Sequence, residues 1–350
     1  MLLIVLPSCK KDKKEEPAPV VVKKYTTAEY IGSSYLTMSR YLATASAAGN
    51  KILFAGGTNG GSVYFNNVEI YDVVTGEWKN SQLSQSRFEL ASASIGKKIF
   101  FAGGRYSSGY SKIVDIYDVE TGLWTSSFLS EERRCLSAAG DKVLFAGGFS
   151  GTYSKTVDIY NATSGLWTTA QLSEGRDYLA AAAAGNKVLF GGGSTGSISV
   201  STVDIYDVTT GAWTVSQLSE VRCFLTATAS GSKVFFAGVA TNSDLSDVVD
   251  IYDVNTGVWT VAHLSEARRN LSAAAIGNIV LFAGGRNITG RSDVVDIYDV
   301  NTGVWSTTHL SEARSHLAGA AIGDKFCFAA GLNGPDWADV SNKVDVFQLK

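Results

Sequence analysis

Apolar and polar positions recur in the same order seven times along this chain. Each copy starts with small residues such as those at 90–95, and continues with a fully apolar run that ends on small residues, such as 53–57. A strand crowded by its neighbours needs small side chains, and a strand covered on both faces is apolar throughout. Two further strands follow, the first reading Val-Asp-Ile-Tyr-Asp and the second beginning at tryptophan. The pattern predicts four-stranded units and no amphipathic helix.

A nearly constant phrase fills the second half of each unit. It runs from Val-Asp-Ile-Tyr-Asp to Leu-Ser-Glu-x-Arg and occurs six times, at 68–87, 114–133, 157–176, 203–222, 249–268 and 295–314. The tryptophans of successive phrases are 43 or 46 residues apart. Self-similarity at this period indicates supersecondary units stacked around or along an axis.

The seventh unit lacks a tryptophan phrase, because the chain ends at Lys350. In the other copies the tryptophan lies nine residues before the arginine of Leu-Ser-x-x-Arg. Counting nine back from Arg40 reaches Ile31, so we predict that 29–34 supplies the missing strand of the last blade. The span 29–350 is 322 residues, or seven units of 46. Such a ring leaves no unpaired sheet edge.

The double glycine, the Tyr-Asp pair, Thr-Gly-x-Trp and the arginine before the inner strand resemble the kelch family, over 29–350. The departures are Gly238-Val239, Ala330-Gly331 and Asn161. The resemblance implies an all-β fold, a seven-bladed β-propeller of four-stranded kelch blades, closed by an N-terminal strand in the last blade. It implies much less about function. Kelch propellers include protein-binding modules, sugar-processing enzymes and the central domain of galactose-oxidase-like copper enzymes.

The N-terminus predicts export and attachment to a membrane. Residues 1–9 form a short apolar segment, and Leu6-Pro7-Ser8-Cys9 resembles a bacterial lipoprotein cleavage box with Cys9 as the lipidated residue. Residues 10–28 are charged and contain proline, which is typical of a flexible tether. The domains are therefore 1–9, 10–28 and the propeller 29–350. We expect an outer-membrane lipoprotein; the alternative is a cytosolic protein with a chance apolar start.

Charge and cysteine content exclude some functions. The formal net charge of −3 does not favour nucleic-acid binding, and no later stretch is apolar enough to span a bilayer. Cys135, Cys223 and Cys327 occupy inner-strand or core positions and do not suggest a disulfide set. We expect a monomer whose only membrane contact is its lipid anchor.

Propeller topology places the double-glycine loops and the Leu-Ser-Glu-x-Arg corners on one face, and most of the sequence variation lies there. Seven arginines are expected to surround the channel on this face: Arg40, Arg87, Arg133, Arg176, Arg222, Arg268 and Arg314. They could form an anion-binding collar, or be neutralised by the glutamate two residues before most of them. Repetition in every blade favours neutralisation. Met38 and Gln85 replace that glutamate beside Arg40 and Arg87, which are therefore predicted to be available to a ligand.

The two residues after each arginine vary freely between copies, as binding surfaces do. Aromatic side chains mixed with Arg and Asp are typical of sugar-stacking and protein-contact surfaces. The predicted binding residues are Arg40, Tyr41, Arg87, Phe88, Arg134, Asp177, Tyr178, Phe224, Arg269, His316 and Trp337. The predicted ligand is a glycan or a protein.

Catalysis is the alternative hypothesis. The chain has three histidines, and His263 and His309 fall on predicted outer strands, so we predict no metal site and no cofactor. A metal-free acid/base set of Glu89, Asp177, Tyr178 and His316 could serve a sugar or uronic-acid isomerase or lyase. The aspartates of the repeated phrase, such as Asp115, lie one per blade. They indicate structural charge pairing and not calcium binding.

Overall fold

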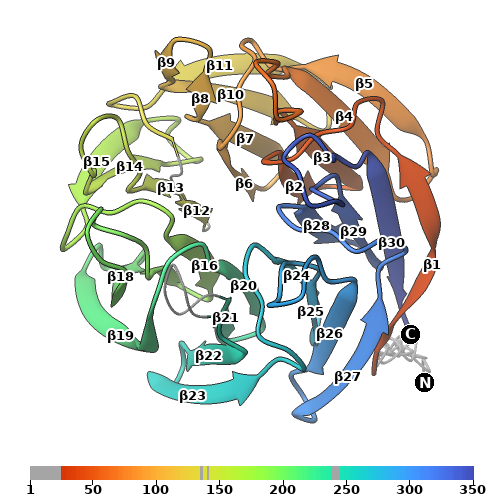
Figure 1. The fold of residues 1–350 in the computed structure, drawn as a ribbon. Coiled ribbons are helices and arrows are strands. Elements are labelled where there is room, and N and C mark those ends of the chain that lie inside the picture. Colours follow the sequence, from red (N-terminus) through yellow and green to blue (C-terminus); the bar gives the residue numbers. More distant parts are fainter. Residues whose placement is uncertain (1–24, 135–136, 140–141, 239–244) are drawn as a thin grey trace, which may run out of the picture.

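The computed structural model describes residues 25–134, 137–139, 142–238 and 245–350. They form seven four-stranded antiparallel sheets arranged as the blades of a propeller, and the described part contains no helix (Figure 1). The all-β, seven-bladed prediction is confirmed. The proposed boundaries at 1–9 and 10–28 lie largely outside the described residues, so the domain division stays a prediction.

The innermost strand of each blade is short and built mostly from small residues, because seven strands crowd around one axis. These strands are β2 (Thr44–Ala48), β6 (Ala91–Ile95), β12 (Ser137–Ala139), β16 (Ala180–Ala184), β20 (Thr226–Ser230), β24 (Ser272–Ile276) and β28 (Ala318–Ile322). The fully apolar second strands are β3 (Lys51–Ala55), β7 (Lys98–Ala102), β13 (Val143–Ala146), β17 (Lys187–Gly191), β21 (Lys233–Ala237), β25 (Ile279–Ala283) and β29 (Lys325–Ala329).

The Val-Asp-Ile-Tyr-Asp phrase forms the third strand, and the tryptophan segment forms the outer one. The third strands are β4 (Asn67–Asp72), β10 (Ile113–Asp118), β14 (Thr156–Tyr160), β18 (Val200–Asp207), β22 (Val248–Asp253), β26 (Val294–Asp299) and β30 (Lys343–Leu349). The outer strands are β5 (Trp78–Gln82), β11 (Trp124–Phe128), β15 (Trp167–Gln171), β19 (Trp213–Arg222), β23 (Val258–His263), β27 (Val304–His309) and β1 (Ala28–Tyr35). A small ribbon of β8 (Arg105–Tyr106) and β9 (Gly109–Tyr110) lies in a loop of the second blade.

The hydrophobic core lies between neighbouring blades. Phe100 of the second blade packs with Val143 and Phe145 of the third, and all three are fully buried. On the outer side, each tryptophan lies against the tyrosine of its third strand, as in the Tyr71–Trp78 pair with ring centroids 4.8 Å apart. Each blade therefore covers the apolar face of the next. This mutual covering lets strands of only five or six residues hold a stable sheet stack.

The two ends of the chain close the ring in one blade, where β1 pairs antiparallel with β30 (Figure 1). The predicted strand is confirmed, but the residue that takes the tryptophan position is Tyr30 and not Ile31. Tyr30 pairs with Phe347, just as Trp78 pairs with Tyr71 in the first blade. The register shifts between Tyr30 and Gly32, so Ile31 is the extra residue of a β-bulge. A bulge adds one residue to one strand, which is why the count of nine ended one position late.

Candidate functional site

The seven arginines form the framework of the loop face and are not a collar open to ligands. We call Arg40, Arg87, Arg133, Arg176, Arg222, Arg268 and Arg314 the arginine ring; all seven are 0% exposed. Each pairs with the buried acid of a third strand, respectively Glu69, Asp115, Asp158, Asp204, Asp250, Asp296 and Asp345. The aspartates of the repeated phrase are thus structural, as predicted.

In each blade, the carboxylate of the third strand fixes the turn that precedes the inner strand. In the second blade Asp115 pairs with Arg87 and also accepts a hydrogen bond from the backbone N–H of Ser84, at 3.3 Å. Arg87 donates further to the carbonyl oxygens of Gly103 at 2.7 Å and Ile113 at 2.8 Å. The Leu-Ser-Glu-x-Arg phrase therefore recurs because each blade contains one such buried arginine–carboxylate pair.

Two parts of the sequence prediction need correction here. The main partner of a ring arginine is the third-strand acid, while the glutamate two residues earlier lies farther away, as Glu131 does at 3.8 Å from Arg133. Arg40 and Arg87 lack that glutamate, yet both are fully buried and paired with Glu69 and Asp115. They cannot contact a ligand. The wrong inference arose because the acid that neutralises each arginine comes from a strand about 28 residues away in the chain.

The two variable residues after each ring arginine point to different places. The first of them forms backbone bridges to the loop between the second and third strands, and we call each set of three bridged residues a loop ladder. The described ladders are Tyr41–Thr58–Tyr64, Phe88–Arg105–Tyr110, Arg134–Phe149–Tyr153, Asp177–Ser194–Ser199, Arg269–Arg286–Arg291 and Ser315–Leu332–Val340. Most side chains at this position are covered by the loop, whereas Arg134 and Arg269 are only half-buried. Tyr41, Phe88 and Asp177 are only 7%, 8% and 3% exposed. Their side chains therefore offer little surface to a ligand, although all three were predicted to bind one.

The second variable residue lines the channel mouth. We call Leu42, Glu89, Tyr178, Phe224, Asn270 and His316 the mouth ring; they come from six different blades. All six have positive φ, between 51° and 56°, which non-glycine residues adopt at an energetic cost. This left-handed turn follows the ladder residue. The predicted binding residues Tyr178, Phe224 and His316 are in this ring. Leu42 and Asn270 were not among the predicted site residues, and Glu89 was named only for the acid/base alternative.

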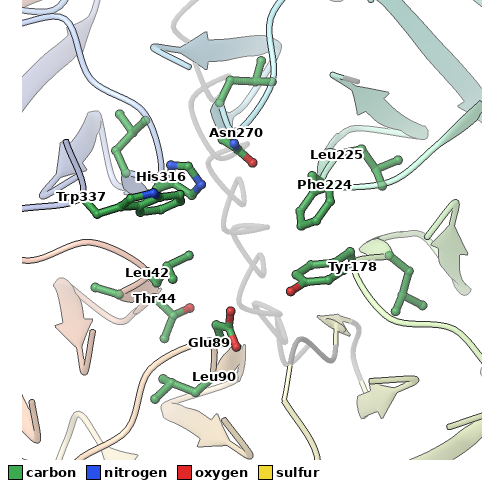
Figure 2. Close-up of a pocket in the computed structure, with 14 residues that line it drawn as sticks. Leu42, Thr44, Glu89, Leu90, Tyr178, Phe224, Leu225, Asn270, His316 and Trp337 are labelled. Atoms are coloured by element: carbon green, nitrogen blue, oxygen red, sulfur yellow. The ribbon is translucent and has the colours of Figure 1, made fainter. Parts of the chain in front are cut away.

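The mouth ring surrounds a cavity of about 500 Å³. Leucines one residue further along the chain line it as well, among them Leu90, Leu179 and Leu271. Figure 2 shows Tyr178 and Phe224 facing His316 and Trp337 across the opening, with Glu89 and Asn270 at the two remaining sides. The cavity thus has two aromatic walls separated by polar groups. This arrangement can stack a flat apolar surface and hydrogen-bond to its edges.

Trp337 is the one predicted residue that reaches the cavity from a longer loop. It is 58% exposed and its ring lies 5.5 Å from Tyr41 and 5.6 Å from His316, measured between centroids. Tyr41 therefore packs against Trp337 and does not line the cavity itself. On the opposite wall the rings of Tyr178 and Phe224 lie 3.9 Å apart.

Arg134 joins the second, third and fourth blades beside the cavity. Its guanidinium donates to the carboxylate of Glu89 at 3.2 Å and to the hydroxyl of Tyr178 at 2.6 Å, and it lies over the Phe149 ring at 5.4 Å. These contacts hold two members of the mouth ring in place. Arg134 itself is not among the lining residues, so its role here is to position the others.

Burial shifts two titrating groups near the cavity. The pKa of Asp177 is raised to about 6, mainly because burial disfavours its charge and although Arg134 acts in the opposite direction. The pKa of His316 is lowered to about 4, first by burial and then by the positive charges of Arg291, Arg269 and Arg286. His316 is therefore neutral near pH 7 and can act as a hydrogen-bond donor or acceptor.

The acid/base alternative is not assembled as one group. Glu89, Tyr178 and His316 line the cavity, but Asp177 is buried beside it and is not a lining residue. His263 and His309 lie on outer strands next to Asp247 and Asp293, each at 3.3 Å. No group of three or more His, Cys, Asp or Glu side chains in the described ranges could hold a metal ion.

Cysteine and membrane predictions are tested only in part. Cys223 and Cys327 are buried and unbridged, and burial raises the pKa of Cys327 to about 12, in line with core positions. Cys9 and Cys135 lie outside the described residues. Within the part of the chain that is described, no helix is long and apolar enough to cross a membrane.

A family model for the Kelch motif matches residues 39–81 and 86–126, which are the first two blades. Each match begins at an arginine-ring corner and ends on an outer strand. The protein is a seven-bladed propeller that contains Kelch motifs. Kelch β-propellers are commonly protein-interaction modules. No curated protein matches the chain.

Proposed function

We propose that this protein is an extracytoplasmic, lipid-anchored binding module that takes one end of a glycan into the channel-mouth cavity. The observation that carries the proposal is the convergence of six variable side chains on that cavity, each in a left-handed backbone conformation. Such conformations are costly, and they recur where a site requires a side chain in a particular place. Here the left-handed conformations direct the second variable residue of each described copy toward one cavity of the size of a small ligand.

The shape and chemistry of the cavity favour a sugar. Its volume of about 500 Å³ falls in the range of small-molecule sites, roughly 300–1,000 Å³. Tyr178, Phe224 and Trp337 offer flat faces to the apolar side of a sugar ring, while Glu89, Asn270 and neutral His316 can bond to its hydroxyl groups. A stable protein interface would need about 800 Å² per partner, so it would have to extend over the surrounding loops.

A protein ligand is the second candidate, because Kelch propellers commonly bind proteins. The resemblance to galactose-oxidase-like enzymes supports the propeller fold, and we do not propose a copper site. Two of the three histidines lie on outer strands, away from the channel. The metal-free sugar isomerase or lyase remains a weaker alternative, since Asp177 does not line the cavity together with Glu89, Tyr178 and His316.

Glycan binding is tested on an array of neutral and acidic oligosaccharides. Tyr178→Ala and Trp337→Ala should each weaken the best binder about tenfold, since each removes one ring from an aromatic wall. Tyr153→Ala is the control: it is an exposed aromatic of the third-blade ladder that does not line the cavity. Binding that is unchanged by both cavity variants would contradict the proposed site. Conversion of a bound sugar would favour the enzyme.

The compartment is a separate part of the proposal, supported by Leu6-Pro7-Ser8-Cys9 and the charged tether after it. Cys9→Ser should abolish fatty-acid labelling and release the protein from membrane fractions without changing its melting temperature. A wild-type protein found wholly in the cytoplasm would exclude the lipid anchor while leaving the cavity hypothesis untouched.

A further inference from the structure

The sixth blade differs from the other described blades in its loop ladder. Its three bridged residues are all arginine: Arg269 pairs with Arg286, and Arg286 pairs with Arg291. We call them the arginine triplet. Directly opposed residues of an antiparallel ladder point to the same side, with Cβ atoms about 5 Å apart, and like charges there repel. The equivalent ladders elsewhere combine aromatic, apolar, hydroxyl or single charged residues.

The triplet is not neutralised by other described residues. None of its three side chains makes an ion pair or a hydrogen bond within the described ranges, and the Nε of Arg291 is buried without a partner there. The acid of the same corner, Glu266, instead accepts hydrogen bonds from Asn287 and Ser292. Asp339 influences Arg291 only from beyond ion-pair distance. Burial and then repulsion from Arg286 and Arg269 lower the pKa of Arg291.

The positive charge of the triplet extends to the cavity. Asn270, which follows Arg269 in the chain, is a member of the mouth ring, and so is His316. All three arginines disfavour a proton on His316, so their positive charges act on a residue that lines the cavity. The three arginines are not lining residues themselves, and they adjoin the cavity through Asn270, which follows Arg269 in the chain. Three bridged arginines without acids are suited to a fixed anion.

We propose that the arginine triplet is a subsite for the carboxylate of an acidic sugar, so that the preferred ligand carries a uronic acid residue. This inference rests on the proposed function, in which the cavity binds a glycan. A guanidinium offers a planar pair of donors that matches the two oxygens of a carboxylate. The sugar ring would lie toward Trp337 and His316, with Asn270 at its edge. Binding removes the repulsion that the free triplet carries.

The test compares glucuronate with glucose, which differ in the carboxylate, and follows the ring signals of His316 by NMR. Glucuronate should shift these signals and raise the pKa of His316, because a bound anion offsets the three positive charges. Glucose should bind at least about tenfold more weakly, the loss expected for one charge-assisted hydrogen-bonded pair. Added salt should weaken glucuronate binding and leave glucose binding unchanged.

Two matched variants separate the subsite from a general effect of charge. Arg286→Gln should remove the preference for glucuronate and leave glucose binding unchanged. Arg105→Gln changes the middle residue of the second-blade ladder, which is also an exposed arginine, and should keep the preference. Arg286→Gln should melt at or above the wild-type temperature, which separates lost recognition from unfolding.

Each other result overturns the inference in a distinguishable way. Equal binding of glucose and glucuronate, or a preference that survives in Arg286→Gln, would exclude the carboxylate subsite and leave the glycan cavity standing. If triglutamate but not glucuronate shifted the NMR signals of His316, the preferred ligand would be an acidic peptide and not an acidic sugar. If neither sugar moved any mouth-ring signal at concentrations near its solubility limit, the subsite and the proposed glycan function would fail together.

Discussion

The arginine ring and the mouth ring circle the same channel two residues apart in the chain, yet they serve different purposes. The arginine ring repeats in every blade, is fully buried and is paired with seven acids. The mouth ring differs from blade to blade and lines a cavity. Charges that repeat in every blade are thus buried and paired as part of the framework, whereas residues that differ between blades face the cavity.

The sixth blade contains both cases side by side. Arg268 is 0% exposed and pairs with Asp296, whereas the next residue, Arg269, belongs to the unneutralised triplet. Two adjacent arginines thus differ in burial, in partner and in expected role.

Removal of the closing strand should have the largest effect. Deleting residues 1–36 removes β1 and exposes the edge of β30 and the buried Phe347, while deleting 1–24 leaves the described propeller whole. The longer deletion should cost more than about 4 kcal/mol of unfolding free energy, beyond the usual range of one substitution. Thermal and urea unfolding of the two truncations measure the difference. Equal stability would show that closure does not depend on β1.

The adjacent arginines provide the sharpest test of the contrast. Arg268→Met leaves the carboxylate of Asp296 buried and unpaired, and should cost about 3–5 kcal/mol of unfolding free energy. Arg269→Met removes a repelling charge and should change that free energy by less than about 0.5 kcal/mol. Urea unfolding of both variants is the measurement. Similar losses in the two would mean that the triplet is also structural.

Asp177 predicts a pH dependence of stability. Its pKa is about 6 when folded and near 3.8 when exposed, so the folded protein binds its proton more tightly. The contribution of this group to stability is therefore fully present below about pH 4 and is lost as pH rises through about 6. Asp177→Asn should stabilise the protein by on the order of 2 kcal/mol at pH 7 and by little at pH 4. A variant that is less stable than wild type at pH 7 would show that the Asp177 charge is stabilising.

The smallest effect concerns the left-handed backbone of the mouth ring. Phe224 has φ of 54° and is 37% exposed, so its side chain adds little to the core. Phe224→Gly should be about 1 kcal/mol more stable than Phe224→Ala, because glycine tolerates this conformation. Both variants should lose glycan affinity to the same extent. A glycine variant less stable than the alanine variant would contradict the role given to this turn.

The propeller, its seven blades and the variable face could be predicted from the amino-acid sequence alone. These follow from local repetition, since each unit carries its own small, apolar and tryptophan-containing strands. The closing strand at 29–34 was also predictable, but the bulge at Ile31 was not, because a bulge is visible only in the pairing of two distant strands. Of the predicted binding residues, Tyr178, Phe224, His316 and Trp337 line the cavity.

Which charges are neutralised, and which variable residue faces the cavity, depends on contacts between segments that are distant in the chain. Glu69 and Asp115, which neutralise Arg40 and Arg87, lie on third strands far along the chain. No local sequence pattern therefore reveals the pairing. The left-handed turn at Glu89 and Asn270 directs their side chains to the channel, while Phe88 is covered by its loop. The arginine triplet is assembled from residues separated by 17 and 5 positions, through backbone bridges that form only when the loop folds back. Repetition fixes an architecture locally, whereas burial and charge pairing depend on which segments the closed ring brings together.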